Sequence, residues 1–283
     1  MRVDLELVRR VEHSGAEMGS RQAAAMAIVA PANRAAAQPL DGGALVSFGR
    51  GSYVNRAMGV GLGGTAPADV VAAITEFYED RWLPPSVEVT PFVDEPLLAA
   101  FASSGYRLHR FRNVYARDLQ SLPPVPAAVA IVPDGPATED GRREILSGEW
   151  AELGSAARST SDEYCRAAAL VDGAHDFVAL VDGVPAACGS LIVINDTGDS
   201  GGNGDLGRIG WLGGAATAVA QRGRGLQSAL LAYRLQLARD LGCTLAAATA
   251  VPGEQSAANM ERLGFTLLYT QAVLTKPPAD VHG

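Results

Sequence analysis

The sequence predicts an α/β protein made of two similar halves, each a sheet flanked by helices. At 283 residues the chain exceeds the usual single domain of about 100–200 residues, so two cores are expected. A proline-rich stretch at 119–127 separates the halves, because consecutive X-Pro steps disfavour helix and central strand. We therefore expect domains at 1–120 and 129–283, joined by a linker at 121–128.

The two halves repeat the same order near their ends. Each has a helix end, a Gly-aromatic pair and a strand, with the glycine at Gly105 in the first half and at Gly264 in the second. Thr90 lies fifteen positions before Gly105, and Thr249 lies fifteen positions before Gly264; each threonine ends a strand-like segment. Each half is thus expected to end strand, helix, strand, helix, strand.

The first half carries a glycine-rich segment at 59–64, before a helical segment at 69–80. The segment fits G-x-G-x-x-G, and Glu88 falls where a ribose-binding acid would lie, so a dinucleotide site is one interpretation. The other is a plain glycine-rich junction, because no buried apolar strand precedes Gly59. The segment has no arginine, and Pro67 is acceptable in the first turn of the helix.

The second half opens with a predicted β-hairpin. Apolar runs at 177–181 and 186–194 flank Asp182-Gly183, a dipeptide typical of two-residue turns. A loop rich in Gly, Asp and Asn follows, including 196–205. Two interpretations of 196–205 are open: a calcium-binding loop, because it is rich in Asp, Asn and Gly, and a flexible hairpin loop. The second is favoured because the EF-hand spacing and its final Glu are missing.

An extended segment at 209–220 leads into a helix predicted for 226–241. The helix carries an apolar stripe, and Gly242 is a natural stop. The stripe consists of Leu226, Leu230, Tyr233, Leu237 and Leu241, while Ser228, Arg234, Gln236 and Arg239 fall outside it.

The junction between this strand and helix reads QRGRG, from Gln221 to Gly225. The first turn of a helix has unpaired N–H groups and a partial positive charge, which favour phosphate. Gly223 and Gly225 let the backbone approach a ligand, and Arg222 and Arg224 add positive charge. The junction therefore predicts a diphosphate site, with a merely basic turn as the alternative.

These residues resemble the GCN5-related N-acetyltransferase (GNAT) superfamily. Its pyrophosphate pattern, Gln/Arg-x-x-Gly-x-Gly/Ala, is matched by Arg222 and Gly225, with Gly223 in addition, whereas Gln227 stands where the family usually has Gly or Ala. The resemblance extends from the hairpin to the last strand. It implies two GNAT-like domains, each a mixed, mostly antiparallel twisted sheet flanked by helices, the first without the pyrophosphate loop.

The resemblance also implies acetyl-coenzyme A (acetyl-CoA) as cosubstrate and direct transfer of its acetyl group to an amine. The strand at 209–220 would part from its neighbour to admit acetyl-CoA, and an amide near 217–219 would hold the thioester oxygen. The resemblance implies that Ser256 and Asn259 are polar contacts to the coenzyme A arm, and an N-cap or first-turn role in a short helix is the equally weighted alternative. The implied cofactor-binding residues are Thr217, Ala218, Val219, Arg222, Gly223, Arg224, Gly225, Leu226, Gln227, Ser256 and Asn259.

No catalytic residue and no metal site is assigned from the sequence. Met260 stands where the family commonly has a tyrosine general acid, and no motif supports Glu163 or Glu254 as the base. The four histidines show no zinc-binding spacing, and no hydrolase elbow is present. An acyl-CoA binding or sensing protein without turnover is therefore the second hypothesis.

Composition limits the partners. A net charge of −8 and a pI near 5.0 argue against nucleic acid and anionic membranes. The cysteines, at 165, 188 and 243, show neither a disulfide framework nor zinc spacing, and no signal-like apolar segment occurs. We expect a cytoplasmic monomer or homodimer that acts on a small-molecule or peptide amine.

Overall fold

The computed structural model describes residues 1–52, 54–152, 158–195 and 207–277. Its contacts divide the chain into two compact units. The C-terminal unit comprises Met1 and Val114–Leu268, and the N-terminal unit comprises Arg2–Asn113 and Tyr269–Gly283. Neither unit is one continuous stretch of sequence, so each is described by its own elements.

The sheet of the C-terminal unit contains the parallel pair β9 and β10 next to an antiparallel β6-β7-β8-β9 series. The hairpin predicted at Asp182-Gly183 is confirmed, with φ of +53° and +79°, as a two-residue type I′ turn requires. The strand order is β11-β5-β10-β9-β8-β7-β6. The strands are β5 (Arg107–Asp118), β6 (Ala130–Pro133), β7 (Ala174–Val181), β8 (Val184–Asn195), β9 (Arg208–Thr217), β10 (Cys243–Ala250) and β11 (Thr266–Thr275).

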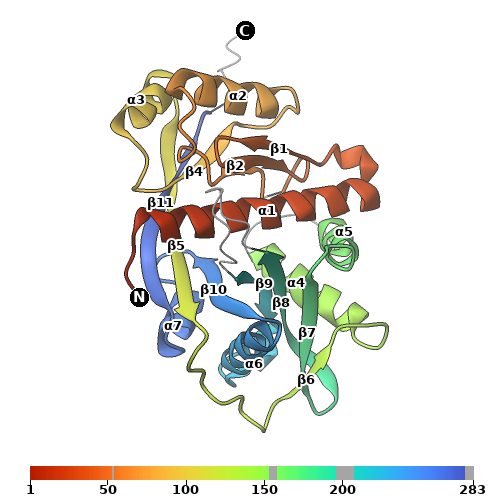
Figure 1. Ribbon diagram of the computed structural model, residues 1–283. Helices are drawn as coiled ribbons and strands as arrows, with labels where there is room; N and C mark the ends of the chain where they lie inside the picture. The colour runs from red at the N-terminus through yellow and green to blue at the C-terminus, as the bar shows by residue number, and fades with distance from the viewer. Residues whose placement is uncertain (53, 153–157, 196–206, 278–283) are drawn as a thin grey trace. The chain divides into compact units, whose positions relative to one another are not determined.

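Helices cover both faces of this sheet (Figure 1). Val178 of β7 packs with residues of α4 (Glu139–Glu152) and α5 (Arg158–Ala168). Its neighbour Phe177 packs with residues of α6 (Leu226–Asp240), and α6 contacts α7 (Gln255–Arg262). Because successive side chains of a strand point to opposite faces, α4 and α5 lie on one face and α6 and α7 on the other.

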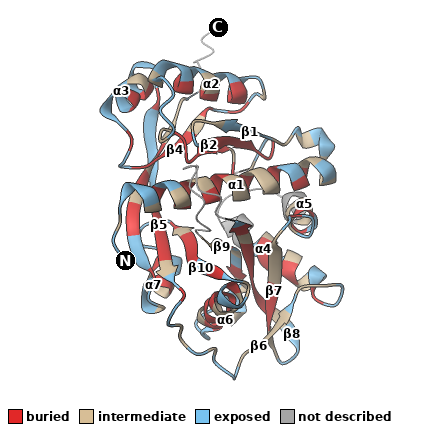
Figure 2. Ribbon diagram, in the orientation of Figure 1, coloured by how far each residue is buried: buried red, intermediate tan, exposed pale blue. Residues whose placement is uncertain are grey.

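Helix α6 begins and ends as the sequence predicts. Gly225 is its N-cap with φ +74°, and Gly242 follows its end with φ +82°. The helix is buried over more of its circumference than the apolar stripe indicates (Figure 2), and Arg234, expected outside that stripe, is only 1% exposed. The apolar period thus located the helix but not its whole buried surface.

The N-terminal unit has the strand order β1-β2-β3-β4-β11-β5. Its core lies between the sheet and two short helices and includes Leu45, Ile74, Tyr78 and Phe101. The long helix α1 contacts β1, β2 and β3 and is capped by Asp4, which accepts from the Leu7 N–H at 3.0 Å. The elements are α1 (Leu5–Val29), η1 (Pro31–Asn33), β1 (Ala36–Leu40), β2 (Gly43–Ser47), β3 (Arg56–Met58), α2 (Pro67–Glu79), β4 (Ser86–Val89) and α3 (Glu95–Ser103).

A buried carboxyl group of α1 lies inside the N-terminal unit. Glu12 is 6% exposed, and its Oε1 accepts from the Tyr269 hydroxyl at 2.6 Å and from the Gln271 amide at 2.8 Å. Burial raises the pKa of Glu12 to about 7, although these hydrogen bonds lower it. The unit therefore contains a carboxyl group that ionises near neutral pH.

The repeated order predicted for the two halves is confirmed. In the first half, α2 connects the two strands of a parallel pair, β3 and β4, in which Ala57 lies opposite Val87. In the second half, α6 connects the parallel strands β9 and β10, in which Gly210 lies opposite Ala246. Strand β11, the last of the second half, pairs with β4 of the first half, and β5, the last of the first half, neighbours β10.

Because of these strand pairings, the compact units do not follow the predicted boundaries along the sequence. Each unit includes part of the final strand of the other half: residues 114–118 of β5 belong to the C-terminal unit, and residues 269–275 of β11 belong to the N-terminal unit. The division into 1–120, 121–128 and 129–283 as domains stays a prediction.

Candidate functional site

Strands β9 and β10 are paired over only part of their length. Within the described residues their parallel register runs from Arg208 to Trp211 on β9 and goes no further than Ala247 on β10. Beyond this point Gly213 and Ala215 are exposed, although they lie well inside β9. The two strands therefore part after Trp211, and one backbone edge of β9 is left without a strand partner.

A β-bulge lies just beyond that separation. Between two regular pairs of the β8–β9 ladder, Gly189 of β8 faces both Gly214 and Ala215 of β9. Gly214 has φ +57°, the left-handed conformation that a bulge of this kind requires. A bulge turns backbone groups out of the ladder, so here it changes their direction beside the open edge of β9.

The end of β9 directs one of the predicted amides toward the open edge. The Ala218 N–H donates to the Ala186 carbonyl of β8 at 2.9 Å. Neighbouring N–H groups of an extended chain point to opposite sides, so that of Thr217 points away from β8. Val219 starts a 3-10 turn, Val219–Gln221, and is exposed. Of the three predicted residues, Thr217 thus has the N–H directed into the gap.

The loop before α6 leaves the helix N-terminus open. Gly223 and Gly225 have φ of +77° and +74°, and a Cβ at either position would meet no atom within 4 Å. The first hydrogen bond of the helix runs from the Ala229 N–H to the Gly225 carbonyl, and no side chain caps the end. The N–H groups of Leu226, Gln227 and Ser228 precede that bond and are arranged as a site for an anion.

Two arginines lie on this loop. Arg222 and Arg224 are both exposed. Arg224 donates to the Gln221 side-chain oxygen at 2.6 Å, which holds the guanidinium beside the turn. The first turn of α6 contains no acidic residue. The positive charges of the arginines and the helix dipole therefore act together at this end of the helix.

Gln227, which departs from the family pattern, lies against the strands. Its Nε2 is 2.7 Å from the Ala216 carbonyl, 3.1 Å from Thr217 Oγ1 and 3.2 Å from the Cys188 carbonyl. The long side chain thus finds polar partners beneath the loop. The structure places Thr217 through Gln227 together in one strand, loop and helix start.

The two predicted residues of α7 make different contacts. Ser256 is exposed, whereas Asn259 accepts from Gln255 at 3.1 Å and from Arg262, within its own helix. Met260 is 4% exposed and belongs to the apolar core. The position at which the family commonly has a tyrosine general acid is therefore part of the core.

Sequence reasoning missed polar groups on the α4–α5 face of the bulge. A Cβ added to Gly214 would lie 2.6 Å from Ser190 Oγ and 3.4 Å from the Tyr164 hydroxyl. Ser190 also donates to Asp176, which forms an ion pair with the buried Arg142 at 2.8 Å. These residues come from separate elements, and no sequence motif links them.

The two glutamates considered as bases gain no role from the structure: Glu163 is partly buried and Glu254 is exposed.

The corresponding loop of the N-terminal unit is occupied by a side chain. Asp41, in the turn between β1 and β2, accepts from the Gly61 N–H at 2.9 Å and from the Thr65 N–H at 2.7 Å. Its carboxylate therefore binds the amides that precede α2, in the loop that corresponds to the arginine-bearing loop before α6. The glycine-rich loop thus binds an internal carboxylate.

Replacing Asp41 by alanine should destabilise the chain by about 1–3 kcal/mol, since two backbone donors lose their acceptor. Sulfate should raise the melting temperature of this variant more than that of the wild type, because an anion can replace the carboxylate. Asp182→Ala is the matched control, because Asp182 has the same left-handed turn conformation before a glycine. Equal sulfate effects in all three proteins would contradict this account.

The expectation that no buried strand precedes Gly59 is wrong, because the short strand β3 (Arg56–Met58) is buried directly before it. The dinucleotide interpretation also required a free carboxylate at Glu88. In the structure Glu88 pairs with Arg56 at 2.7 Å and with Arg112 at 3.0 Å. Burial raises the pKa of Glu88, but the two guanidinium groups outweigh it and hold the pKa below its ordinary value. The acid therefore serves this internal ion-pair cluster. The calcium interpretation of 196–205 lies outside the described residues.

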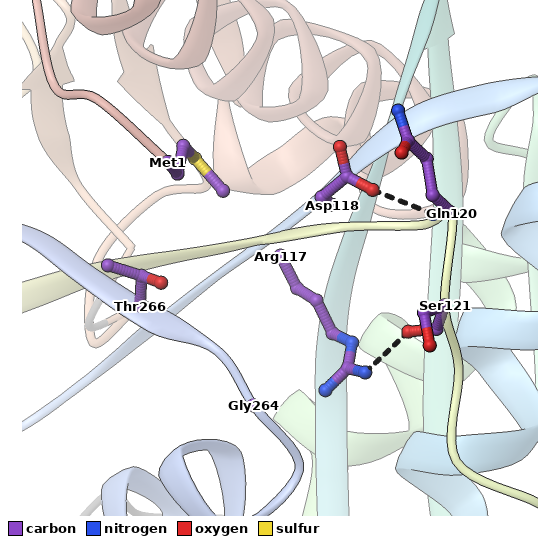
Figure 3. A pocket seen from close by; sticks show the side chains of 7 residues that line it. All are labelled: Met1, Arg117, Asp118, Gln120, Ser121, Gly264 and Thr266. Carbon is purple, nitrogen blue, oxygen red and sulfur yellow. Dashed lines mark hydrogen bonds between the residues drawn. The ribbon is translucent and has the colours of Figure 1, made fainter.

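A small cavity in the C-terminal unit lies apart from the loop residues. It has a volume of about 260 Å³, below the ~300–1,000 Å³ of most ligand sites, and shares no residue with the α6 loop. Figure 3 shows the Arg117 side chain directed at Ser121, to whose carbonyl it donates at 2.7 Å. The lining residues are Met1, Arg117, Asp118, Gln120, Ser121, Gly264 and Thr266.

None of the described helices is long and apolar enough to cross a membrane.

Part of the chain matches the model of a known family. Residues 142–265 match the model of the acetyltransferase (GNAT) family. A GCN5-related N-acetyltransferase from Kribbella flavida has a TM-score of 0.54 at 20% identity, covering 76% of each chain. A tandem GNAT protein from the clavulanic acid biosynthesis pathway has a TM-score of 0.52 at 18% identity, covering 78% of this chain and 71% of its own.

A third solved structure, a GCN5-related N-acetyltransferase from Sphaerobacter thermophilus, has a TM-score of 0.50 at 16% identity, covering 75% of this chain and 69% of its own. No curated protein sequence matches the chain. The likenesses to solved structures confirm the predicted fold class of GNAT-like halves. The chain therefore resembles GNAT acetyltransferases in its fold, and its residues 142–265 match the acetyltransferase (GNAT) family model.

Proposed function

We propose that the protein is an N-acetyltransferase that moves an acetyl group from acetyl-CoA to an amine. One observation carries the proposal: an uncapped helix N-terminus with two glycines and two arginines lies at the end of a strand that has parted from its neighbour. The loop fits a diphosphate, and the edge of β9 fits an extended chain with amide groups. Acetyl-CoA has both parts.

The proposed binding mode divides the cofactor between the predicted residues. The diphosphate lies on the N–H groups from Gly223 to Gln227, with Arg222 and Arg224 neutralising its charge. The acetylated arm runs along β9, and the Thr217 N–H binds an oxygen of it. Ser256 of α7 is exposed and available to the far side of the arm. The N-terminal loop binds no second cofactor, because Asp41 occupies its amides.

The proposed reaction is direct attack. The amine nitrogen forms a bond to the thioester carbonyl carbon, the carbon–sulfur bond breaks, and coenzyme A leaves as a thiolate that takes a proton. An amine of ordinary pKa is neutral in only about one of two thousand molecules at pH 7, so a base must remove its proton. Backbone donors aimed at the thioester oxygen stabilise the negative charge that develops on it.

The proposed acceptor is a cationic amine. The net charge of −8 favours a cationic amine, either a small molecule or a peptide side chain. The exposed Gly213 and Ala215 leave room for it beside the bulge.

A second candidate is an acyl-CoA binding or sensing protein without turnover. The observation that favours it is Met260, which is packed into the core where the family commonly has a tyrosine acid. Such a protein would use the same loop and the same strand edge, but it would not release coenzyme A.

Melting with added acetyl-CoA, followed by a thiol-release assay on a panel of amines, separates these functions. For the acetyltransferase we expect the melting temperature to rise with acetyl-CoA and free thiol to appear above the blank with at least one amine. Stabilisation without thiol release would support the sensing protein. Absence of stabilisation would contradict both.

A further inference from the structure

Two side chains of α6 reach the backbone on either side of the β9 bulge. Gln227 and Arg234 are seven residues apart, about two turns, and so lie on the same face of the helix. Gln227 Nε2 donates to the Ala216 carbonyl at 2.7 Å and to the Cys188 carbonyl at 3.2 Å. In the ladder Cys188 and Ala216 are direct partners, the last regular pair on one side of the bulge.

Arg234 makes the equivalent contacts on the other side of the bulge. Its Nη1 donates to the Ser190 carbonyl at 2.9 Å and to the Gly213 carbonyl at 3.1 Å. Ser190 and Gly213 form the next regular pair of the ladder. Each side chain therefore bridges the two residues of one flanking pair. Together they supply donors to carbonyls where the bulge interrupts the ladder.

The guanidinium of Arg234 is buried, and its charge is met by backbone carbonyls. Arg234 is 1% exposed, and no described carboxylate lies within ion-pair distance of it. Burial lowers its pKa to about 10, so it stays charged at neutral pH. A Cβ at Gly189 would lie 2.7 Å from Arg234 Cζ, so Gly189 makes room for the guanidinium. A buried cation of this kind is costly, and its carbonyl contacts offset part of the cost.

Holding these carbonyls also fixes the N–H groups on the open edge. A peptide unit is planar and trans, so fixing the direction of a C=O fixes that of the next N–H. Gln227 thus sets the Thr217 N–H through the Ala216 carbonyl, and Arg234 sets the Gly214 N–H through the Gly213 carbonyl. The Gly214 carbonyl lies 3.6 Å from Cys188 Sγ, a weaker donor to the same segment.

We propose that Gln227 and Arg234 are positioning residues that hold the β9 bulge in the shape that binds the acetyl thioester. Their side chains act through the backbone N–H groups of β9 and touch no substrate; only the main-chain N–H of Gln227 belongs to the proposed diphosphate site. The proposal rests on acetyl-CoA binding at β9, as proposed above. It also gives a reason for the residue at 227, where the family usually has Gly or Ala: in this chain an amide side chain supports the bulge.

Two readouts on matched glutamine variants of the full chain test this inference. Gln227→Met removes the donor at nearly constant volume, and Gln236→Met is the control, because Gln236 donates from the same helix to Pro123 at 3.1 Å. The first readout is hydrogen–deuterium exchange of the peptide covering 208–217. The second is the ratio of the dissociation constants of free CoA and acetyl-CoA, which isolates the acetyl thioester.

We expect Gln227→Met to accelerate exchange in 208–217, while Gln236→Met leaves it unchanged. Wild type should bind acetyl-CoA about fivefold more tightly than CoA, the effect of one hydrogen bond, and Gln227→Met should bring this ratio close to one. Any change at the diphosphate site affects both ligands alike and cancels in the ratio. Arg234→Met should have the same effect on the ratio, and Arg234→Lys, which keeps a charged donor, should restore part of it.

Unchanged exchange and an unchanged ratio in Gln227→Met would overturn the inference and leave the proposed function intact. Gln227 carries the test because it is only partly buried, whereas Arg234→Met removes a fully buried side chain and can affect folding. If wild type binds neither CoA nor acetyl-CoA, the proposed function fails and the thioester role fails with it. In that case, faster exchange in Gln227→Met would show that the Gln227 side chain holds the bulge, but it would give the bulge no role in binding the thioester.

Discussion

Replacing Arg222 and Arg224 together by alanine should weaken acetyl-CoA binding roughly 10- to 100-fold and leave the melting temperature of the free protein nearly unchanged. Both side chains are exposed, so they contribute little to the folded core. Both flank an uncapped helix N-terminus, where their charges would meet the diphosphate. Calorimetric titration of the variant and the wild type measures the difference.

Arg239→Ala is the control for this pair. Arg239 lies in the last turn of the same helix, exposed and paired with its neighbour Asp240, so its loss should not change affinity. Raising the salt concentration should weaken binding in the wild type and in Arg239→Ala more than in the double variant, because exposed charges are screened. Parallel losses of stability and affinity in the double variant would indicate that the arginines support only the turn.

Replacing Glu12 by glutamine should change how the stability of the protein depends on pH. The folded-state pKa of Glu12, about 7, lies above the ordinary 4.5, so the folded state prefers the protonated form. The stabilisation from this preference is fully present below pH 4.5 and is lost as the pH rises through 7. Relative to wild type, Glu12→Gln should therefore gain on the order of 3 kcal/mol between pH 5 and pH 8.

Denaturant unfolding at a series of pH values measures this gain. Glutamine keeps an oxygen acceptor for the Tyr269 hydroxyl, so the two proteins should have similar stability near pH 5. The control is Glu17→Gln in the same helix, where Glu17 is 41% exposed and pairs with Arg21. The gain between pH 5 and pH 8 should be larger for Glu12→Gln than for this control. Equal gains in the two variants would contradict the raised pKa of Glu12.

Local signals in the sequence predicted the elements that build the candidate site. The turn chemistry of Asp182-Gly183 located the hairpin, and the apolar period with Gly225 and Gly242 located α6. These signals are local because turn conformation and helix ends depend on residues a few positions apart. The equal spacing before Gly105 and Gly264 similarly revealed the repeat.

The remaining features depend on contacts between residues distant in sequence. The pairing of β11 with β4 joins segments almost 190 residues apart, as the Ser86 to Leu274 hydrogen bond shows, and no local pattern encodes it. Asp41 gave no sign of its role because its partners, Gly61 and Thr65, are fixed only when the loop folds over it.

The burial of Arg234 was missed for a different reason. A single apolar stripe assigns one buried face to a helix, whereas α6 packs against strands and against α7 over a wider surface. A polar residue on that wider surface can be buried where backbone carbonyls accept its hydrogen bonds, and for Arg234 the bulge makes the Ser190 and Gly213 carbonyls available.

The most direct test of the central claim is a crystal structure of the full chain with acetyl-CoA. The account predicts the diphosphate on the N–H groups from Gly223 to Gln227, beside Arg222 and Arg224, and the thioester at the β9 edge near Thr217. It also predicts that Asp41 stays bound to the glycine-rich loop. A diphosphate bound at that loop, or at the cavity around Arg117, with the α6 N-terminus empty, would contradict it.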